Sequence, residues 1–253
     1  MCTEQIYDVP MQRIYDGVLH ELQNRIVNND MQFVCLDIGA GGGGLLKRIS
    51  SVLNIKAYAC DYHVERFDHK ICIIQQVDLN NDRLPYNDDY FDLVTCSEVF
   101  EHLENYRASL REAFRVLKKG GIFIVTTPNV LNMKSRIRYL ISGFANLFGP
   151  LPIKTDNYYS TGKHITPIPY FYLAHSLIDT GFDDINLNVD KLQESSVFYM
   201  ALLFPLLWPL WKLFLYYERK SGTLTDKNSC HVSKHFSKRI MAGRTVILSA
   251  LKI

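Results

Sequence analysis

The first residues that could do chemistry form a glycine-rich run, Asp37-Ile38-Gly39-Ala40-Gly41-Gly42-Gly43, between an apolar segment and a helical pattern. Glycines at such a junction let the backbone turn sharply and let a ligand approach the main chain. The helix that follows presents free N–H groups and a partial positive charge at its N-terminus. These features predict a site for a nucleoside-containing cofactor at the carboxyl ends of parallel strands. Alone, the run is equally typical of a flexible tight turn.

Two further acids follow the next two predicted strands. Asp61 lies 20 residues after Gly41, where a carboxylate can accept hydrogen bonds from both hydroxyls of a ribose. Asp78 ends the third predicted strand and could accept a hydrogen bond from an adenine exocyclic amine. Each aspartate by itself is also typical of a helix N-cap or a turn. With Asp37, however, three acids at successive strand ends beside one glycine turn favour a cofactor site.

The elements that must position these residues alternate along the chain. Short apolar runs predict strands at residues 33–38, 55–60, 71–74, 91–96, 122–125, 185–189 and 245–251. Amphipathic patterns predict helices at residues 10–28, 62–67, 104–118 and 170–179. This alternation is typical of βαβ units, so we expect a mainly parallel sheet with helices on both faces.

Composition restricts the classes of protein that fit. The 253 residues carry a formal net charge of +2, with 47% hydrophobic and 21% charged residues. A disordered chain would have fewer apolar residues and a larger net charge. A dedicated nucleic-acid binder would usually be clearly basic. We therefore expect a folded domain and no nucleic-acid partner.

The cysteines and the N-terminus predict a compartment. None of the six cysteines forms a C-x-x-C pair, and no Cys/His group has zinc-ligand spacing, so no metal site is expected. The first residues lack a basic segment followed by an apolar one, so no signal peptide is expected either. These features favour a reducing, cytoplasmic setting.

Several motifs together resemble the class I S-adenosylmethionine-dependent methyltransferases. The Asp37-x-Gly39-x-Gly41-x-Gly43 run resembles the first motif of that family. Further similarity covers about residues 30–130, and extends more loosely over 164–190 and 243–252. It includes Leu84-Pro85-Tyr86, Phe91-Asp92-Leu93-Val94, Ser97-Glu98-Val99-Phe100-Glu101-His102-Leu103, Phe114-Arg115-Val116-Leu117-Lys118-Lys119-Gly120-Gly121 and Thr127-Pro128-Asn129. The resemblance implies a seven-stranded sheet whose last strand is antiparallel, and S-adenosylmethionine as the cofactor.

The resemblance also implies roles around the glycine turn. Gly39, Ala40 and Gly41 would line the methionine and ribose portions of the cofactor through backbone contacts, with Gly43 completing the motif. Asp37 would help to order the cofactor amino group through water.

Five residues at the following strand ends receive the remaining cofactor roles from the resemblance. Asp61 would bind the ribose hydroxyls, and Tyr62 would lie against the adenine. Asp78 and Leu79 would meet the adenine edge. The carbonyl of Cys96 would face the cofactor ammonium group.

The implied chemistry is in-line displacement at the sulfonium methyl group, for which the protein mainly positions and desolvates the reactants. An oxygen or nitrogen nucleophile can also need a general base. His102 and His164 are the two candidates, because an imidazole titrates near neutral pH. The alternatives are that His102 packs under the cofactor loop and that His164 fixes a lid. Tyr158 and Tyr159 could line the substrate site.

Residues 197–217 do not fit the generic fold, because 18 of these 21 residues are apolar or aromatic. The stretch is long enough to span a bilayer, but Pro205 and Pro209 would break or kink a continuous helix. The flanking strands should also join one sheet, so both ends must lie on one side. We expect a re-entrant or in-plane element with its aromatic residues at headgroup depth.

Charge near this segment favours the same interpretation. Residues 211–253 carry nine Lys and Arg against two acidic residues, and basic residues beside an apolar anchor favour anionic lipid. We expect membrane-surface contact through residues 197–220, with a second contact near 133–151. The alternatives are a lid or a dimer interface.

The sequence thus predicts one α/β domain over residues 1–253. Its Rossmann-like core spans about 30–190 and 243–253, with an N-terminal helix at 10–28 and a hydrophobic, basic insertion at about 191–242. The expected activity is methyl transfer from S-adenosylmethionine to oxygen of a small or lipid-linked acceptor, at the inner face of a membrane. The motifs are similar to those of quinone-type O-methyltransferases and of methyltransferases of cell-surface glycan pathways. The alternatives are an NAD(P)-dependent oxidoreductase and a non-catalytic, membrane-recruited binding module.

Overall fold

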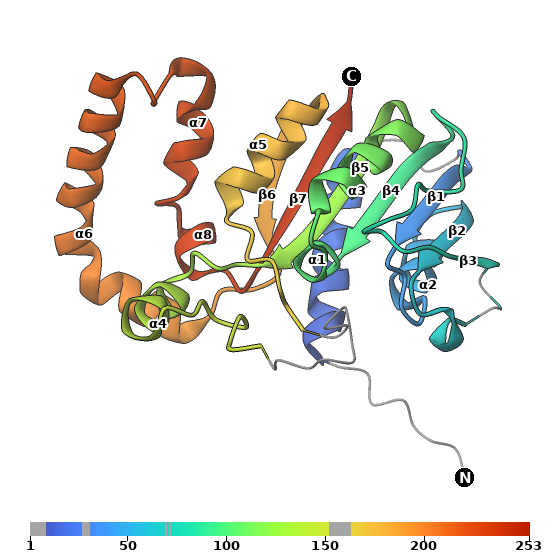
Figure 1. The fold of residues 1–253 in the computed structure, drawn as a ribbon, viewed down its shortest axis with the longest axis horizontal. Coiled ribbons are helices and arrows are strands. Elements are labelled where there is room, and N and C mark those ends of the chain that lie inside the picture. Colours follow the sequence, from blue (N-terminus) through green and yellow to red (C-terminus); the bar gives the residue numbers. More distant parts are fainter. Residues whose placement is uncertain (1–8, 27–30, 69, 71, 152–162) are drawn as a thin grey trace, which may run out of the picture.

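The computed structural model describes residues 9–26, 31–68, 70, 72–151 and 163–253, and within them one seven-stranded sheet (Figure 1). The strand order is β3-β2-β1-β4-β5-β7-β6, and β7 runs antiparallel to both of its neighbours. The strands are β1 (Phe33–Ile38), β2 (Ile55–Asp61), β3 (Ile74–Gln76), β4 (Phe91–Ser97), β5 (Leu117–Pro128), β6 (Phe182–Val189) and β7 (Thr245–Lys252). The predicted Rossmann-like sheet with an antiparallel last strand is confirmed.

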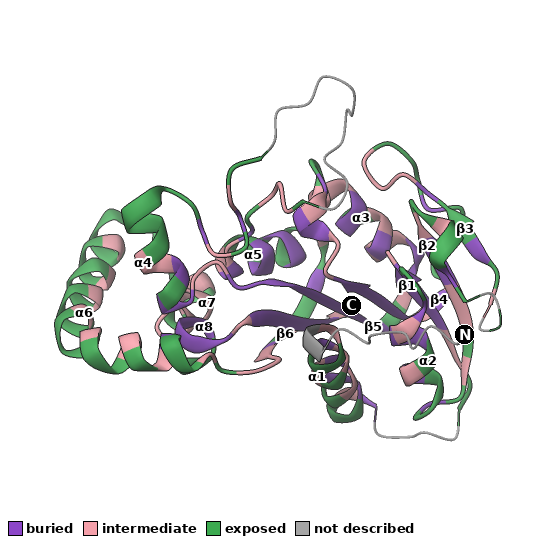
Figure 2. Ribbon diagram, turned by 90° about the horizontal axis from the view of Figure 1, so that it is seen from below, coloured by how far each residue is buried: buried purple, intermediate pink, exposed green. Residues whose placement is uncertain are grey.

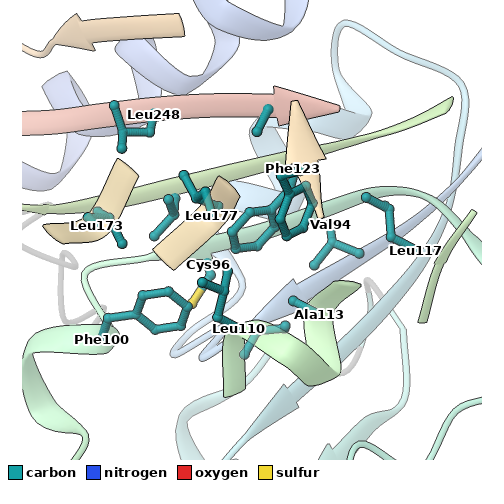
Figure 3. Packing of buried hydrophobic residues seen from close by; sticks show 14 of the residues in the cluster. Val94, Cys96, Phe100, Leu110, Ala113, Leu117, Phe123, Leu173, Leu177 and Leu248 are labelled. Atoms are coloured by element: carbon teal, nitrogen blue, oxygen red, sulfur yellow. The ribbon is translucent and has the colours of Figure 1, made fainter. Parts of the chain in front are cut away.

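Helices cover both faces of the sheet. One buried cluster lies on the side of α1 (Val9–Arg25) and α2 (Gly44–Ser50). The other lies on the side of α3 (Tyr106–Val116) and α5 (Tyr170–Thr180). Figure 3 shows this second cluster, where Cys96 and Phe123 of the sheet meet Leu110 of α3 and Leu177 of α5. The two layers hold the carboxyl ends of the strands in fixed positions relative to each other.

Some boundaries differ from the predicted ones for identifiable reasons. The helix expected at 104–118 ends at Val116, and the strand expected at 122–125 begins at Leu117. Leu117 pairs with Phe91 and the register shifts before Leu93, so the first part of β5 is irregular. The third strand covers three residues at the sheet edge, where it pairs with β2 alone. The expected helix at 62–67 is a single 3₁₀ turn, η1 (Val64–Arg66), and α1 ends at Arg25, while residues 27–30 lie outside the described part.

A helical lobe projects beyond β6 at one end of the molecule (Figures 1 and 2). It contains α4 (Met133–Ser142), α6 (Glu194–Ser221), α7 (Asp226–Lys234) and α8 (Lys238–Ala242). The Gln193 N–H donates a hydrogen bond to the Ala242 carbonyl at 2.7 Å, and Leu192 forms an isolated antiparallel β-bridge with Gly243. The two ends of the insertion therefore lie side by side. Helix α6 is continuous through Pro205 and Pro209 but its axis bends (Figure 1), because each proline removes a helix hydrogen bond.

Candidate cofactor and acceptor site

The glycine-rich run forms the turn between β1 and α2, as predicted. Gly39 and Gly41 have positive φ angles of 70° and 53°, a backbone conformation that residues with a Cβ rarely adopt. A Cβ at Gly39 would lie 2.3 Å from Val99 Cγ2, whereas one at Gly41 would have no described atom within 4 Å. The N–H groups of Gly39 and Ala40 donate to the Cys60 carbonyl at 2.8 and 3.2 Å. The turn is therefore packed on one side and leaves open space at Gly41 for a ligand.

Asp61 ends β2 directly beside this turn. Its Oδ2 accepts a hydrogen bond from the Gly41 N–H and its Oδ1 accepts one from the His63 N–H, both at 2.8 Å. Each carboxylate oxygen has a second lone pair, so the group can still accept hydrogen bonds from two adjacent hydroxyls. The structure thus brings together the turn and the acid that the sequence assigned to a ribose.

Asp37 is the penultimate residue of β1, and its side chain is almost fully buried. Its Oδ1 accepts a hydrogen bond from Thr95 Oγ1 at 2.7 Å. Burial raises the pKa of Asp37 to about 7; the Thr95 hydrogen bond opposes this rise and the nearby Asp61 adds to it. Tyr15 of α1 also lies beside this turn, since a Cβ at Gly44 would be 3.2 Å from its ring. Burial, and then the charge of Asp37, raise the pKa of Tyr15 to about 12. A carboxylate so short of positive partners suits a cofactor ammonium group.

The residues assigned to the adenine are less closely grouped. Tyr62 is exposed beyond β2, and Leu79 is half-buried against the core. Asp78 lies in a turn beyond β3, where its Oδ1 accepts from the Asn80 N–H and its Oδ2 from the Asn81 side chain. The Cys96 side chain points into the core (Figure 3), so only its backbone can reach a ligand. Like the assignments at the glycine turn, Asp37 and Asp61, these four cofactor assignments remain predictions.

A second group of polar residues lies where β4 and β5 end. Glu101, His102 and His164, here called the Glu–His–His cluster, each offer a ligand or proton-accepting atom, and these atoms lie within 4.8 Å of one another. The two imidazole rings meet edge to face with centroids 4.9 Å apart. Glu101 and His102 belong to the 3₁₀ turn η2 (Phe100–His102), and the Glu101 carbonyl accepts hydrogen bonds from the Ile165 and Thr166 N–H groups. These bonds tie the segment carrying His164 to η2.

Burial determines the protonation of this cluster. It lowers the pKa of His102 and of His164, so both rings are neutral near pH 7. It also raises the pKa of Glu101 well above its ordinary value, and the nearby Glu98 adds to that rise. His102 Nδ1 hydrogen-bonds the Lys163 carbonyl at 2.9 Å. A neutral imidazole can accept a proton through its other nitrogen, so the cluster can act as a base.

A cavity of about 730 Å³ lies against His164, between α4 and the segments at 143–151 and 164–169. Its walls are mainly apolar, and include Leu131, Leu140, Phe144, Phe148 and Ile165. Arg136 also lines it; its guanidinium donates to the carbonyls of Leu131 and His235 and forms no ion pair among the described residues. Tyr158 and Tyr159, expected at the substrate site, lie outside the described residues.

Sequence reasoning missed several residues of this site. Glu98 and Glu101 stand in the quoted motif but received no role; two acids three residues apart directly after a strand were the available signal. Glu98 has a positive φ of 55° and its Oε1 accepts a hydrogen bond from Thr126. Tyr15 carried no sequence signal, because it lies in the N-terminal helix, far from every motif.

The strand order and the site define the class of protein. Dinucleotide-binding oxidoreductases have the order 3-2-1-4-5-6 without the inserted reversed strand, so the order found here, with antiparallel β7 between β5 and β6, argues against the NAD(P) alternative. A reversed seventh strand, together with a glycine turn and an acid at the end of the second strand, is the arrangement that the resemblance to class I methyltransferases implied.

Comparisons with known proteins agree with this class. Residues 36–125 match a family described as a methyltransferase domain. The chain is 34% identical over 102 residues to a sarcosine/dimethylglycine N-methyltransferase of Halorhodospira halochloris, covering 37% of each chain. It is 23% identical over 240 residues to a ubiquinone biosynthesis O-methyltransferase of Rickettsia typhi, covering 83% of this chain and 87% of that one. A methyltransferase structure from Archaeoglobus fulgidus shares the fold with a TM-score of 0.56 at 19% identity, over 94% of both chains.

The strand order, the family match over residues 36–125 and the relatives together support a class I S-adenosylmethionine-dependent methyltransferase, with S-adenosylmethionine as the cofactor. The match to the Halorhodospira enzyme spans little more than a third of that protein, and the match to the family covers residues 36–125 only. These matches therefore do not identify the methyl acceptor.

Proposed function

We propose that the protein methylates a hydroxyl oxygen of an apolar, lipid-linked acceptor. The observation that carries this proposal is the apolar cavity of about 730 Å³ beside His164. Such a volume suits a small-molecule substrate, and its apolar walls favour a hydrocarbon or aromatic group over a sugar or an amino acid. The likeness to a ubiquinone biosynthesis O-methyltransferase supports the same acceptor class.

The polar residues of the cavity suit a particular orientation of the acceptor. The Glu–His–His cluster offers a proton acceptor for the hydroxyl that attacks the sulfonium methyl group. The oxygen forms a bond to the methyl carbon, the carbon–sulfur bond breaks to leave S-adenosylhomocysteine, and the hydroxyl proton passes to the cluster. Arg136, with no carboxylate partner among the described residues, favours an acceptor that also carries an anionic group.

The surface beside the cavity suits delivery from a membrane. Helix α6 is long and apolar enough to cross a bilayer, with none of its most apolar 18-residue window buried. One of its faces packs on Phe236 through Phe204, Trp208 and Trp211. The opposite side carries exposed leucines and a tyrosine at helical spacing, namely Leu202, Leu206, Leu210, Leu213 and Tyr217.

We propose that this stripe, here called the α6 stripe, lies in the plane of an anionic membrane. Helix α4 packs on α6, and its Leu140 and Ile141 are almost fully exposed; Leu140 also lines the cavity. Lys and Arg residues of α6, α7 and α8 supply the positive charge that anionic headgroups attract. A lipid-linked acceptor could then enter the cavity without crossing water. The protein would be a peripheral enzyme on the inner face of the membrane.

Mass spectrometry can test the acceptor class. Lipid and aqueous extracts are incubated separately with deuterated-methyl S-adenosylmethionine and the protein, and Asp61→Ala serves as the cofactor-binding control. We expect a labelled product in the lipid extract that is absent with the control. A labelled product only in the aqueous extract would contradict the lipid-linked acceptor. Cofactor binding without a labelled product in either extract would favour the non-catalytic binding module.

A further inference from the structure

We propose that the Glu–His–His cluster binds one divalent first-row transition-metal ion, such as Mn²⁺, Fe²⁺, Co²⁺ or Zn²⁺. The donor atoms of Glu101, His102 and His164 lie within 4.8 Å of one another. Ligands on an ion bound at about 2.1 Å are roughly 3–4 Å apart, so small side-chain rotations bring all three to one ion. The expectation of no metal site rested on Cys/His spacing, whereas these donors come from segments about 60 residues apart.

Unpartnered buried atoms are the second observation. Glu101 is 0% exposed, and its Oε1 has no hydrogen-bond partner among the described residues. His164 Nδ1 is buried and likewise has no partner there. A buried polar atom without a partner is destabilising, so two in one cluster need a physical reason. One cation between them would satisfy both atoms.

The surrounding hydrogen bonds also suit metal ligands. Because the Lys163 carbonyl can only accept, His102 Nδ1 donates to it, and Nε2 keeps the lone pair that a metal binds. Histidine ligands commonly use their second nitrogen in this way, which fixes the tautomer and the ring orientation. Glu101 Oε2 accepts a hydrogen bond from Thr127 Oγ1 at 3.3 Å, which leaves Oε1 for the ion. Each of the three side chains thus has one atom free to bind.

The donor set indicates the kind of ion. Two imidazoles and one carboxylate suit first-row transition metals, whereas Mg²⁺ and Ca²⁺ prefer oxygen ligands. Three protein ligands leave coordination positions open. His102 and His164 are only half-buried and His164 lines the apolar cavity, so the ion would have an entry path and could meet a ligand there.

If the proposed acceptor is correct, the ion would act on its hydroxyl. A metal ion that binds a hydroxyl oxygen lowers its pKa and yields a better nucleophile. With the ion bound, the proton would leave to water and the imidazoles would serve as ligands; only without the ion would the cluster itself accept the proton. This consequence rests on the proposed function, but metal binding does not, because it can be measured without any acceptor.

The test uses the full chain without a polyhistidine tag, after treatment with a chelator. Co²⁺ is titrated into the protein while visible absorption and heat are recorded. We expect one Co²⁺ per chain with d–d absorption bands. His102→Gln and His164→Gln should each weaken Co²⁺ binding at least tenfold, and the exposed His175→Gln should leave it unchanged. Binding of S-adenosylhomocysteine by each variant shows that its fold is intact.

Two results would overturn the site. One is the absence of stoichiometric Co²⁺ in the wild type; the other is equal Co²⁺ affinity in the wild type and in both cluster variants. Should a variant fail to bind S-adenosylhomocysteine, the wild type alone decides: Mn²⁺ must broaden the NMR signals of the His102 and His164 rings before those of His175. Uniform broadening would also overturn the site. None of these outcomes depends on the labelling experiment, which tests the acceptor class and not metal binding.

Discussion

Replacing Asp37 with asparagine is expected to stabilise the cofactor-free protein at neutral and alkaline pH. The Asp37 carboxyl group is almost fully buried, and burial raises its pKa from 3.8 to about 7. Between these values an unfolded chain holds Asp37 ionised, while the folded chain must keep it protonated. The folded state therefore binds more protons, and the free energy of unfolding falls as pH rises through this range. Below pH 3.8 the group is protonated in both states and has no effect.

The size of the effect follows from the two pKa values of Asp37. Each pH unit between them lowers the free energy of unfolding by about 1.4 kcal/mol. The loss is thus about 2 kcal/mol at pH 5 and about 4 kcal/mol above pH 7, to order of magnitude. Asparagine has nearly the same shape, stays neutral, and can still accept the Thr95 hydroxyl hydrogen bond. It should therefore recover this loss without opening a cavity.

Urea unfolding of the wild type and Asp37→Asn at pH 5 and pH 8 measures the difference. We expect the variant to be more stable at both values, with a gain roughly 2.5–3 kcal/mol larger at pH 8. S-adenosylmethionine should stabilise the wild type more than the variant, because its ammonium group would pair with the ionised carboxylate. A gain that does not depend on pH, or a variant less stable at pH 8, would refute the role of burial at Asp37.

Three further predictions concern the cofactor turn and the lobe. Asp61→Ala should weaken S-adenosylhomocysteine binding at least tenfold by calorimetry, since it removes the paired hydroxyl acceptor; unchanged affinity would reject the ribose assignment. Gly39→Ala should lower the melting temperature more than Gly41→Ala, because only the first Cβ meets a packed side chain; equal shifts in differential scanning calorimetry would count against this packing. Leu206→Glu with Leu210→Glu should abolish flotation with anionic liposomes, whereas Ile178→Glu on α5, 48% exposed, should not. Full flotation of the double variant would exclude the α6 stripe as the membrane contact, and self-association lost in its place would indicate a dimer interface.

The cofactor half of the site could be predicted because its signals are local. Each strand end is marked by a short apolar run followed by glycine or aspartate, and parallel strands bring their carboxyl ends to one edge. Gly39, Gly41 and Asp61 therefore meet as soon as β1 and β2 pair in register. The bounds of β3 and β5 were less predictable, since an edge position and a register shift depend on neighbouring strands rather than on the segment itself.

The acceptor half depends on contacts that no local pattern records. His164 was a candidate from the sequence, but its place beside His102 depends on hydrogen bonds between distant segments, from residues 165 and 166 to Glu101 and from His102 to Lys163. Likewise, Pro205 and Pro209 predicted a break or a kink, and the packing of α6 on α4, α8 and Phe236 determines which of its faces remains exposed.

The sequence by itself thus determined the fold class and the cofactor, because hydrophobic periodicity and glycine placement act over a few residues. Only the tertiary structure decided which polar groups of distant segments share one buried environment. Burial and proximity set the pKa of Asp37, the unpartnered atoms of Glu101 and His164, and the cavity beside them. The pKa of Asp37, the unpartnered atoms and the cavity all depend on how distant segments of the chain pack together. That packing is a property of the whole core.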